Sequence, residues 1–321
     1  MTSKRIAHAH LVKIKSDNGN IDKVIKDTQR SFLEKQKISY GTNNDEVLNE
    51  MYEYKWEQYF SKFYIEVPNS EPMPCYKAMA KIEFPRRVKF GRDGQPLDRK
   101  DRINVNHPYI ILFRKNEDIY MGIITSYSPD INRVEKLFGE ERVEQLGASQ
   151  YLTDSFFVWI YYHYSKGIKI MDDLTLNNIT GFTGIVSDPS NTFSGDSDNT
   201  ANLIITKAFV SNKNPLKSLK LDVNSNYLLT LLILTEKRDI SIDIHKTTVL
   251  LQTNSESEEL LAISYVYVYL LPRLLLCYKK EEENFKRENN DFSKEIGIDV
   301  INSIVQRNNI SLKEVSKLYK E

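Results

Sequence analysis

The densest group of side chains that could bind a charged ligand is the run at residues 84–102, FPRRVKFGRDGQPLDRKDR. It contains three aspartates and seven basic residues: Arg86, Arg87, Lys89, Arg92, Arg99, Lys100 and Arg102. The dipeptide Asp93-Gly94 is typical of a tight turn between two strands, so we predict a basic β-ribbon here. Such a ribbon can neutralise the phosphates of DNA or RNA and release their counterions.

Aromatic residues lie close to this run. Phe84, Phe90 and Tyr109 could offer surfaces on which bases stack. Two other interpretations stay open at this point. The run could be a solvated loop whose cations pair with its own aspartates, or it could contact a partner protein.

Two histidines near the start of the chain are candidates for a metal site. His8 and His10 are two residues apart, so on a strand their rings share one face. Zinc sites in proteins generally use three or four protein ligands, and the nearest further donor is Asp17. Strand histidines with ordinary hydrogen-bond partners are the simpler interpretation, so we predict no metal and no cofactor.

Candidate catalytic groups are sparse. Asp243 and His245 could form an acid–base pair on one strand face. The chain lacks the phosphate-binding, dinucleotide-binding, serine-hydrolase and zinc-protease motifs. We therefore predict a non-enzymatic protein, with a metal-dependent nuclease or hydrolase as the alternative. The acidic and basic residues nearest to such a site are Asp172, Asp173, Asp239, Asp243 and Lys246.

Composition limits the possible classes. The 321 residues include 44 basic and 44 acidic side chains, so no overall charge attracts nucleic acid or anionic membrane, although a local patch still could. Two cysteines in unrelated contexts exclude a disulfide scaffold and favour a reducing cytoplasm. Residues 1–10 have no apolar signal-peptide core.

One apolar segment, Leu260 to Tyr278, has a single charged residue, Arg273. A membrane-spanning helix needs about 20 apolar residues, so the segment is long enough. Pro272 and four tyrosines argue instead for a buried core helix, kinked or broken at the proline. We predict no membrane insertion.

Hydrophobic periodicity predicts the elements that must hold these groups. In the first half, strands are expected at residues 5–15, 76–84, 109–113 and 119–127, and helices at 21–37, 45–63 and 131–145. In the second half we expect a capped helix at 153–166, an irregular stretch at 168–214 and an antiparallel meander at 219–253. A long helix from 257 and shorter ones at 291–306 and 311–320 complete the chain.

This order lacks strict strand–helix alternation, so the fold class is predicted to be α+β, with antiparallel sheets, packed helices and a helical C-terminus. Domains are expected at 1–150 and 151–321. The mixed charges at 279–289 suit the rim of an oligomer, so we expect a homo-oligomer or a hetero-complex.

Together these observations favour a cytoplasmic, non-enzymatic nucleic-acid-binding subunit of a multi-component system. The abundance of Lys, Asn, Ile and Tyr indicates an AT-rich, bacterial genome, and antiviral defence is the bacterial role we expect. A protein-interaction scaffold is the remaining alternative.

Overall fold

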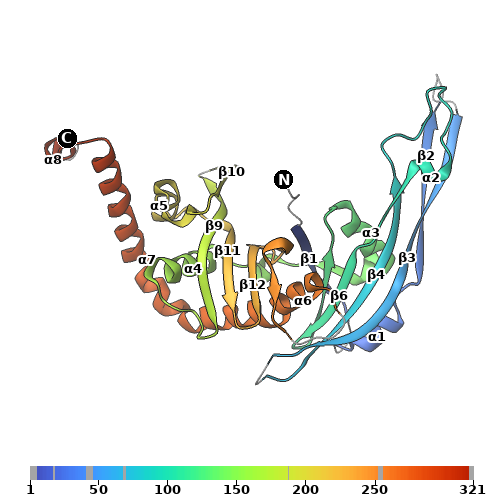
Figure 1. Cartoon of the computed structure of the whole chain (residues 1–321), viewed down its shortest axis with the longest axis horizontal. Coiled ribbons are helices and arrows are strands. Elements are labelled where there is room, and N and C mark those ends of the chain that lie inside the picture. Colours follow the sequence, from blue (N-terminus) through green and yellow to red (C-terminus); the bar gives the residue numbers. More distant parts are fainter. Residues whose placement is uncertain are drawn as a thin grey trace. The chain divides into compact units, whose positions relative to one another are not determined.

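The computed structural model describes residues 6–16, 19–40, 46–67, 70–186, 188–251 and 256–317. The chain forms two compact units (Figure 1). The N-terminal unit comprises Arg5–Gln150 and Leu251–Val268, and the C-terminal unit comprises Tyr151–Leu250 and Tyr269–Glu321. Strands pair in antiparallel fashion throughout the described chain, so the predicted α+β class is confirmed.

The N-terminal unit is built on six successive strands, with two short strands beside them. In spatial order the six are β1 (Ile6–Ile14), β7 (Asp118–Ile124), β6 (Tyr109–Lys115), β4 (Met73–Pro85), β3 (Glu46–Ile65) and β2 (Ser31–Tyr40). The short strands are β5 (Ile103–Asn106), which pairs with β4, and β8 (Val143–Gln145), which pairs with β1. The predicted strands 5–15, 76–84, 109–113 and 119–127 correspond to β1, β4, β6 and β7.

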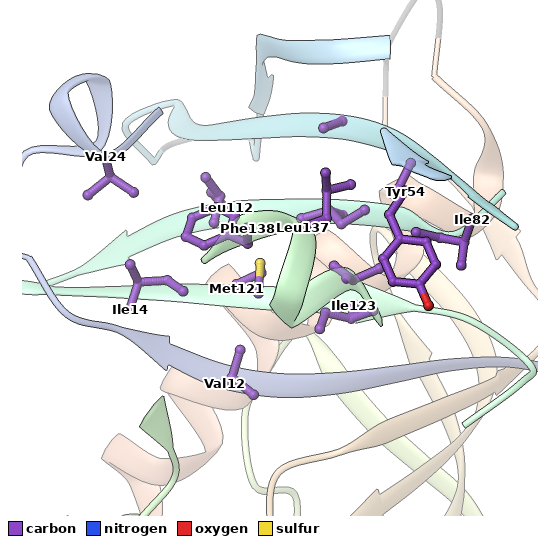
Figure 2. Close-up of a cluster of buried hydrophobic side chains, with 14 of the residues drawn as sticks. Val12, Ile14, Val24, Tyr54, Ile82, Leu112, Met121, Ile123, Leu137 and Phe138 are labelled. Carbon is purple, nitrogen blue, oxygen red and sulfur yellow. The ribbon is translucent and has the colours of Figure 1, made fainter. Parts of the chain in front are cut away.

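One face of this sheet carries a cluster of buried hydrophobic side chains, shown in Figure 2. Helices α1 (Ile21–Lys26) and α3 (Pro129–Phe138) contribute side chains to it. Val12, Met121 and Phe138 are each 0% exposed. Alternate residues of a strand point to opposite faces, so one row from each strand fills this core.

The opposite face receives helix α6 (Glu258–Tyr265) and the π-helical turn Val266–Leu270 that follows it. The Tyr267 hydroxyl donates to the Ala9 carbonyl (3.0 Å), and its ring stacks on Phe113 with centroids 5.7 Å apart. Gly122 leaves room for this ring, because a Cβ there would lie 3.3 Å from Cε2 of Tyr267 and 2.8 Å from Cγ1 of Ile111.

Two predicted helices of this unit are wrong. The helix predicted at 21–37 ends at Lys26, and the region predicted as a helix at 45–63 lies in the β2–β3 hairpin. Burial there follows a period of two: Tyr52 and Tyr54 are 2% and 1% exposed, whereas Met51 is 40% exposed. Aromatic side chains favour strands, and here Tyr52, Tyr54 and Trp56 face the core.

The helix predicted at 131–145 is too long. Helix α3 stops at Phe138, where Gly139 takes a φ of 112°. A 3₁₀ turn (Glu140–Arg142) and strand β8 follow. A φ in this range favours glycine and ends the helix.

The C-terminal unit has antiparallel strands of its own. In spatial order its strands are β10 (Asp188–Asp196), β9 (Leu174–Val186), β11 (Leu216–Ser225), β12 (Leu228–Thr235) and β13 (Ile240–Asp243), with β14 (Thr248–Val249) also paired to β12. The predicted meander is confirmed. The stretch predicted as irregular at 168–214 is not, because it holds β9, β10 and helix α5 (Ile204–Ser211).

The predicted helix 153–166 is confirmed as α4 (Asp154–Lys166). The Thr153 hydroxyl caps its first turn by accepting from the Phe156 N–H at 3.2 Å. Gly167 ends it in the left-handed region, with a φ of 65°. Each end of this helix is determined by one residue that is recognisable in the sequence, which is why the prediction is accurate.

The long C-terminal helix is also confirmed, but Pro272 does not break it. Helix α7 (Leu271–Arg307) follows the π-helical turn directly and contains the region predicted as a separate helix at 291–306. The π turn already departs from α-helical hydrogen bonding, and Pro272 lies in the first turn of α7, where its missing N–H is tolerated. Helix α8 (Leu312–Lys317) begins at the predicted capping box of Ser311 and Glu314.

Residues Glu258–Arg307 are the one helical stretch of the described chain that is long and apolar enough to cross a membrane. Its most apolar window is 61% buried within the fold. The core helix of a soluble protein has the same length and composition, so the stretch is only weak evidence for a membrane span.

Candidate nucleic-acid interface

The basic run forms the connection between β4 and β5, whose last and first residues, Pro85 and Ile103, pair with each other. The predicted turn at Asp93-Gly94 is present: Gly94 has a φ of 77°, and the Gly91 N–H donates to the Gln95 carbonyl at 2.8 Å. The predicted ribbon is much shorter than the run, since its two arms share a single bridge, Phe90 with Pro96. Helix α2 (Arg99–Arg102) leads into β5.

Arg102 anchors this loop to β3. Its Nε lies 2.5 Å from Oε2 of Glu50, and it also donates to the Leu97 carbonyl. The Glu50 side chain is only 4% exposed and that of Arg102 only 14%. Separating the two members of a largely buried ion pair would leave an uncompensated buried charge, which is costly. The pair therefore holds the end of the loop in place.

Arg99 supplies a second anchor. Its Nη2 lies 2.6 Å from Oε2 of Glu83 and 3.0 Å from the Met51 carbonyl. Burial acts to raise the pKa of Glu83, but hydrogen bonds from Arg99 and from the Glu53 N–H outweigh burial and hold it below its ordinary value. The Glu83 carboxylate raises the pKa of Arg99. Neither arginine is therefore an uncompensated charge.

Arg86 makes neutral contacts. Its Nε donates to Oδ1 of Asn104 at 2.9 Å and to the Ile103 carbonyl at 3.1 Å. These bonds orient the guanidinium next to β5 and leave its charge uncompensated by any carboxylate within the described ranges.

The other four cations of the run differ from the anchors. Within the described part of the chain, no hydrogen bond, ion pair or ring contact involves the side chains of Arg87, Lys89, Arg92 or Lys100. The structure also shows no ion pair between the run's cations and its own aspartates in that part of the chain; the Asp93 carboxylate accepts from the Gln95 N–H instead (3.1 Å). Together with Arg86, these four residues therefore carry the uncompensated positive charge of the loop. Arg87, Arg92 and Lys100 are exposed, and Lys89 is half-buried.

The aromatic rings near the run already have intramolecular contacts. Phe90 stacks on Tyr40, at the end of β2, with centroids 5.7 Å apart. Phe84 packs against Tyr127 at 5.2 Å, and the Arg133 guanidinium lies 4.8 Å from the Phe84 ring centroid. Stacking of bases on these two rings would require the rings to leave these contacts.

The remaining candidates occupy ordinary structural positions. His10 Nε2 lies 3.2 Å from Oε1 of Gln145, while His8 is exposed on β1 and Asp17 lies outside the described residues. Oδ1 of Asp243 accepts from the His245 N–H at 3.2 Å and caps a 3₁₀ turn.

Asp173 pairs with Arg273, which lowers the pKa of this aspartate through their hydrogen bond. Among the residues that the structure describes, no three His, Cys, Asp or Glu side chains lie together as a metal site would need. The geometry thus adds nothing to the nuclease or hydrolase alternative.

The two residues that sequence reasoning missed are the anchoring acids Glu50 and Glu83. Glu50 lies on a strand that had been predicted as a helix, so its position next to the basic run was not recognisable. Comparison with known proteins gives no family: no protein-family model and no curated protein matches this chain.

Proposed function

We propose that this chain is a non-enzymatic nucleic-acid-binding subunit of a larger cytoplasmic assembly, and that it contacts phosphates through Arg87, Lys89, Arg92 and Lys100. One observation supports this proposal above the others. These four cations have no described carboxylate partner, whereas Arg99 and Arg102 of the same loop are held by Glu83 and Glu50. The loop is thus anchored to the sheet by two arginines while its other cations stay uncompensated.

Such an arrangement suits a polyanion for two physical reasons. Anchoring of the loop lowers the entropy lost when it binds. Each phosphate that a cation neutralises releases counterions, which favours binding even for a chain with no net charge. The cytoplasmic location rests on the two cysteines: both are free, and burial raises the pKa of the Cys75 thiol to about 12, so it stays protonated.

The test replaces all four cations with alanine and measures binding to a duplex DNA and to a single-stranded RNA at several salt concentrations. If all four contact phosphates, the slope of log K against log[salt] for duplex DNA becomes shallower by about 3–4. The affinity at low salt falls at least tenfold. Unchanged affinity and slope would overturn the proposal.

The matched control removes the same charge from α7, by alanine at Lys280, Lys286, Arg287 and Lys294. These side chains are exposed, and Lys286 lies 3.0 Å from both Glu282 and Glu283. This variant should bind nucleic acid like the unmodified chain. An equal loss in both variants would mean that net charge alone governs binding, and the loop would lose its assigned role.

A further inference from the structure

Strand β2 is the last strand of the N-terminal unit's sheet. It pairs with β3 along its whole length, from Ser31 opposite Lys55 to Tyr40 opposite Glu46. The described residues place no strand on its other side. Within those residues, the backbone of Ser31–Ser39 makes no hydrogen bond except to β3. Half of its N–H and C=O groups therefore point outward, as a template for another strand.

The side chains of β2 form two different rows. In the inner row, Ile38 is buried, and Glu34 accepts from Lys136 at 2.8 Å and from the Tyr54 hydroxyl. In the outer row, Leu33 is 59% exposed, and Lys35 and Lys37 are exposed without a hydrogen bond or ion pair to any described residue. The inner row holds the strand rigidly on the core while the outer row stays accessible.

We propose that the outer edge of β2 binds an extended acidic peptide segment of another protein as an added strand. Backbone hydrogen bonds to the free edge would provide affinity that does not depend on sequence. Carboxylates at alternate positions of the segment would lie opposite Lys35 and Lys37, and an apolar side chain would lie opposite Leu33. The two lysines thus select the charge of the partner.

A second copy of this chain is a poor occupant of the same edge. Antiparallel pairing of two β2 strands about Lys35, Gln36 or Lys37 places lysine opposite lysine. Like charges in directly opposed positions destabilise a strand pair, and edge lysines are a common protection against self-pairing. Lys35 and Lys37 thus disfavour self-pairing, and the same two lysines would form ion pairs with an acidic strand.

The experiment uses the full chain and a fluorescein-labelled ten-residue peptide with threonine at every second position. The positions between the threonines carry aspartate opposite Lys35 and Lys37 and valine opposite Leu33. Fluorescence anisotropy should show saturable binding, at least tenfold tighter than for the peptide with lysine in place of aspartate. The Lys35→Glu/Lys37→Glu variant should reverse this preference. Absence of saturable binding by the aspartate peptide would overturn the inference.

Two matched peptides test whether the segment binds as a strand. N-methylation of alternate residues along one edge of the peptide should weaken binding at least tenfold, while N-methylation along the other edge should change it little. Equal effects of the two modifications would show that only side chains are recognised and would overturn the added-strand geometry.

Three protein controls complete the design. The circular dichroism spectrum and thermal midpoint of the Lys35→Glu/Lys37→Glu variant must match those of the unmodified chain. A Lys279→Glu/Lys280→Glu variant on α7 should bind the peptide normally. The variant with alanine at the four loop cations should also keep peptide binding, which separates this inference from nucleic-acid binding. If the β2 variant loses oligonucleotide but the unmodified chain takes no peptide, the lysines serve nucleic acid instead.

Discussion

Two regions of this protein carry similar numbers of exposed basic side chains but differ in what those side chains contact. On α7, Lys286 lies 3.0 Å from Glu282 and from Glu283, and Lys294 lies 3.5 Å from Asp291. A helix brings residues three and four positions apart together, so such partners come from the same local sequence. The loop between β4 and β5 has no such repeat, and its ion pairs involve Glu83 on β4 and Glu50 on β3.

The ion pairs of the two regions therefore differ in how much they contribute to stability. The α7 pairs are solvent-exposed, and exposed pairs contribute little to stability. In the loop, two arginines meet acids that are largely buried, and the other cations stay uncompensated. A count of charges in the sequence does not distinguish these cases, because the distinction depends on which acid lies opposite each cation.

The largest expected effect comes from removing the shared anchor. Glu50→Ala leaves Arg102, whose side chain is 14% exposed, without its carboxylate, and it removes one partner of Arg99. Breaking a buried pair by removing one member is costly, so we expect the free energy of unfolding to fall by about 3 kcal/mol. Urea unfolding at neutral pH measures the change.

The matched replacement on α7 is Glu283→Ala. The Glu283 side chain is 82% exposed in its pair with Lys286, so we expect a change within about 0.5 kcal/mol. Similar losses in both variants would remove the distinction between the two regions.

The accuracy of the sequence predictions follows the same division between local and long-range contacts. Helix α4 was predicted within one residue because Thr153 and Gly167 cap it with bonds inside one turn. The β2–β3 hairpin was missed because dense aromatic residues at 45–63 fit a helix as easily as a strand until one face is known to be buried. The basic run was identified, but its division into anchors and uncompensated cations depends on which acid lies opposite each cation. Glu50 is 52 residues from Arg102, and Glu83 directly precedes the run but pairs with Arg99, 16 residues further along the chain.

The next effect tests how firmly the tip of the loop is held. Phe90 stacks on Tyr40 with an interplanar angle of 23°. Aromatic pairs contribute about 0.5–1.5 kcal/mol beyond their buried area, so Phe90→Leu should destabilise the chain by about 1 kcal/mol. A double-mutant cycle with Tyr40→Leu should give a coupling energy of similar size. A coupling energy near zero would mean that only the arginine anchors hold the loop.

The smallest effect concerns pH and isolates the second anchor. Because the folded pKa of Glu83 is lowered from 4.5, its contribution to stability is fully present above that pH and is lost as the pH falls through the lowered value. The Glu83→Gln variant lacks this proton uptake. Its thermal midpoint should therefore decrease less than that of the unmodified chain as the pH falls below about 4.5. Parallel curves for the two proteins would show that Arg99 does not stabilise the ionised Glu83 carboxylate, and Glu50 would then be the remaining carboxylate partner of Arg99 in the described chain.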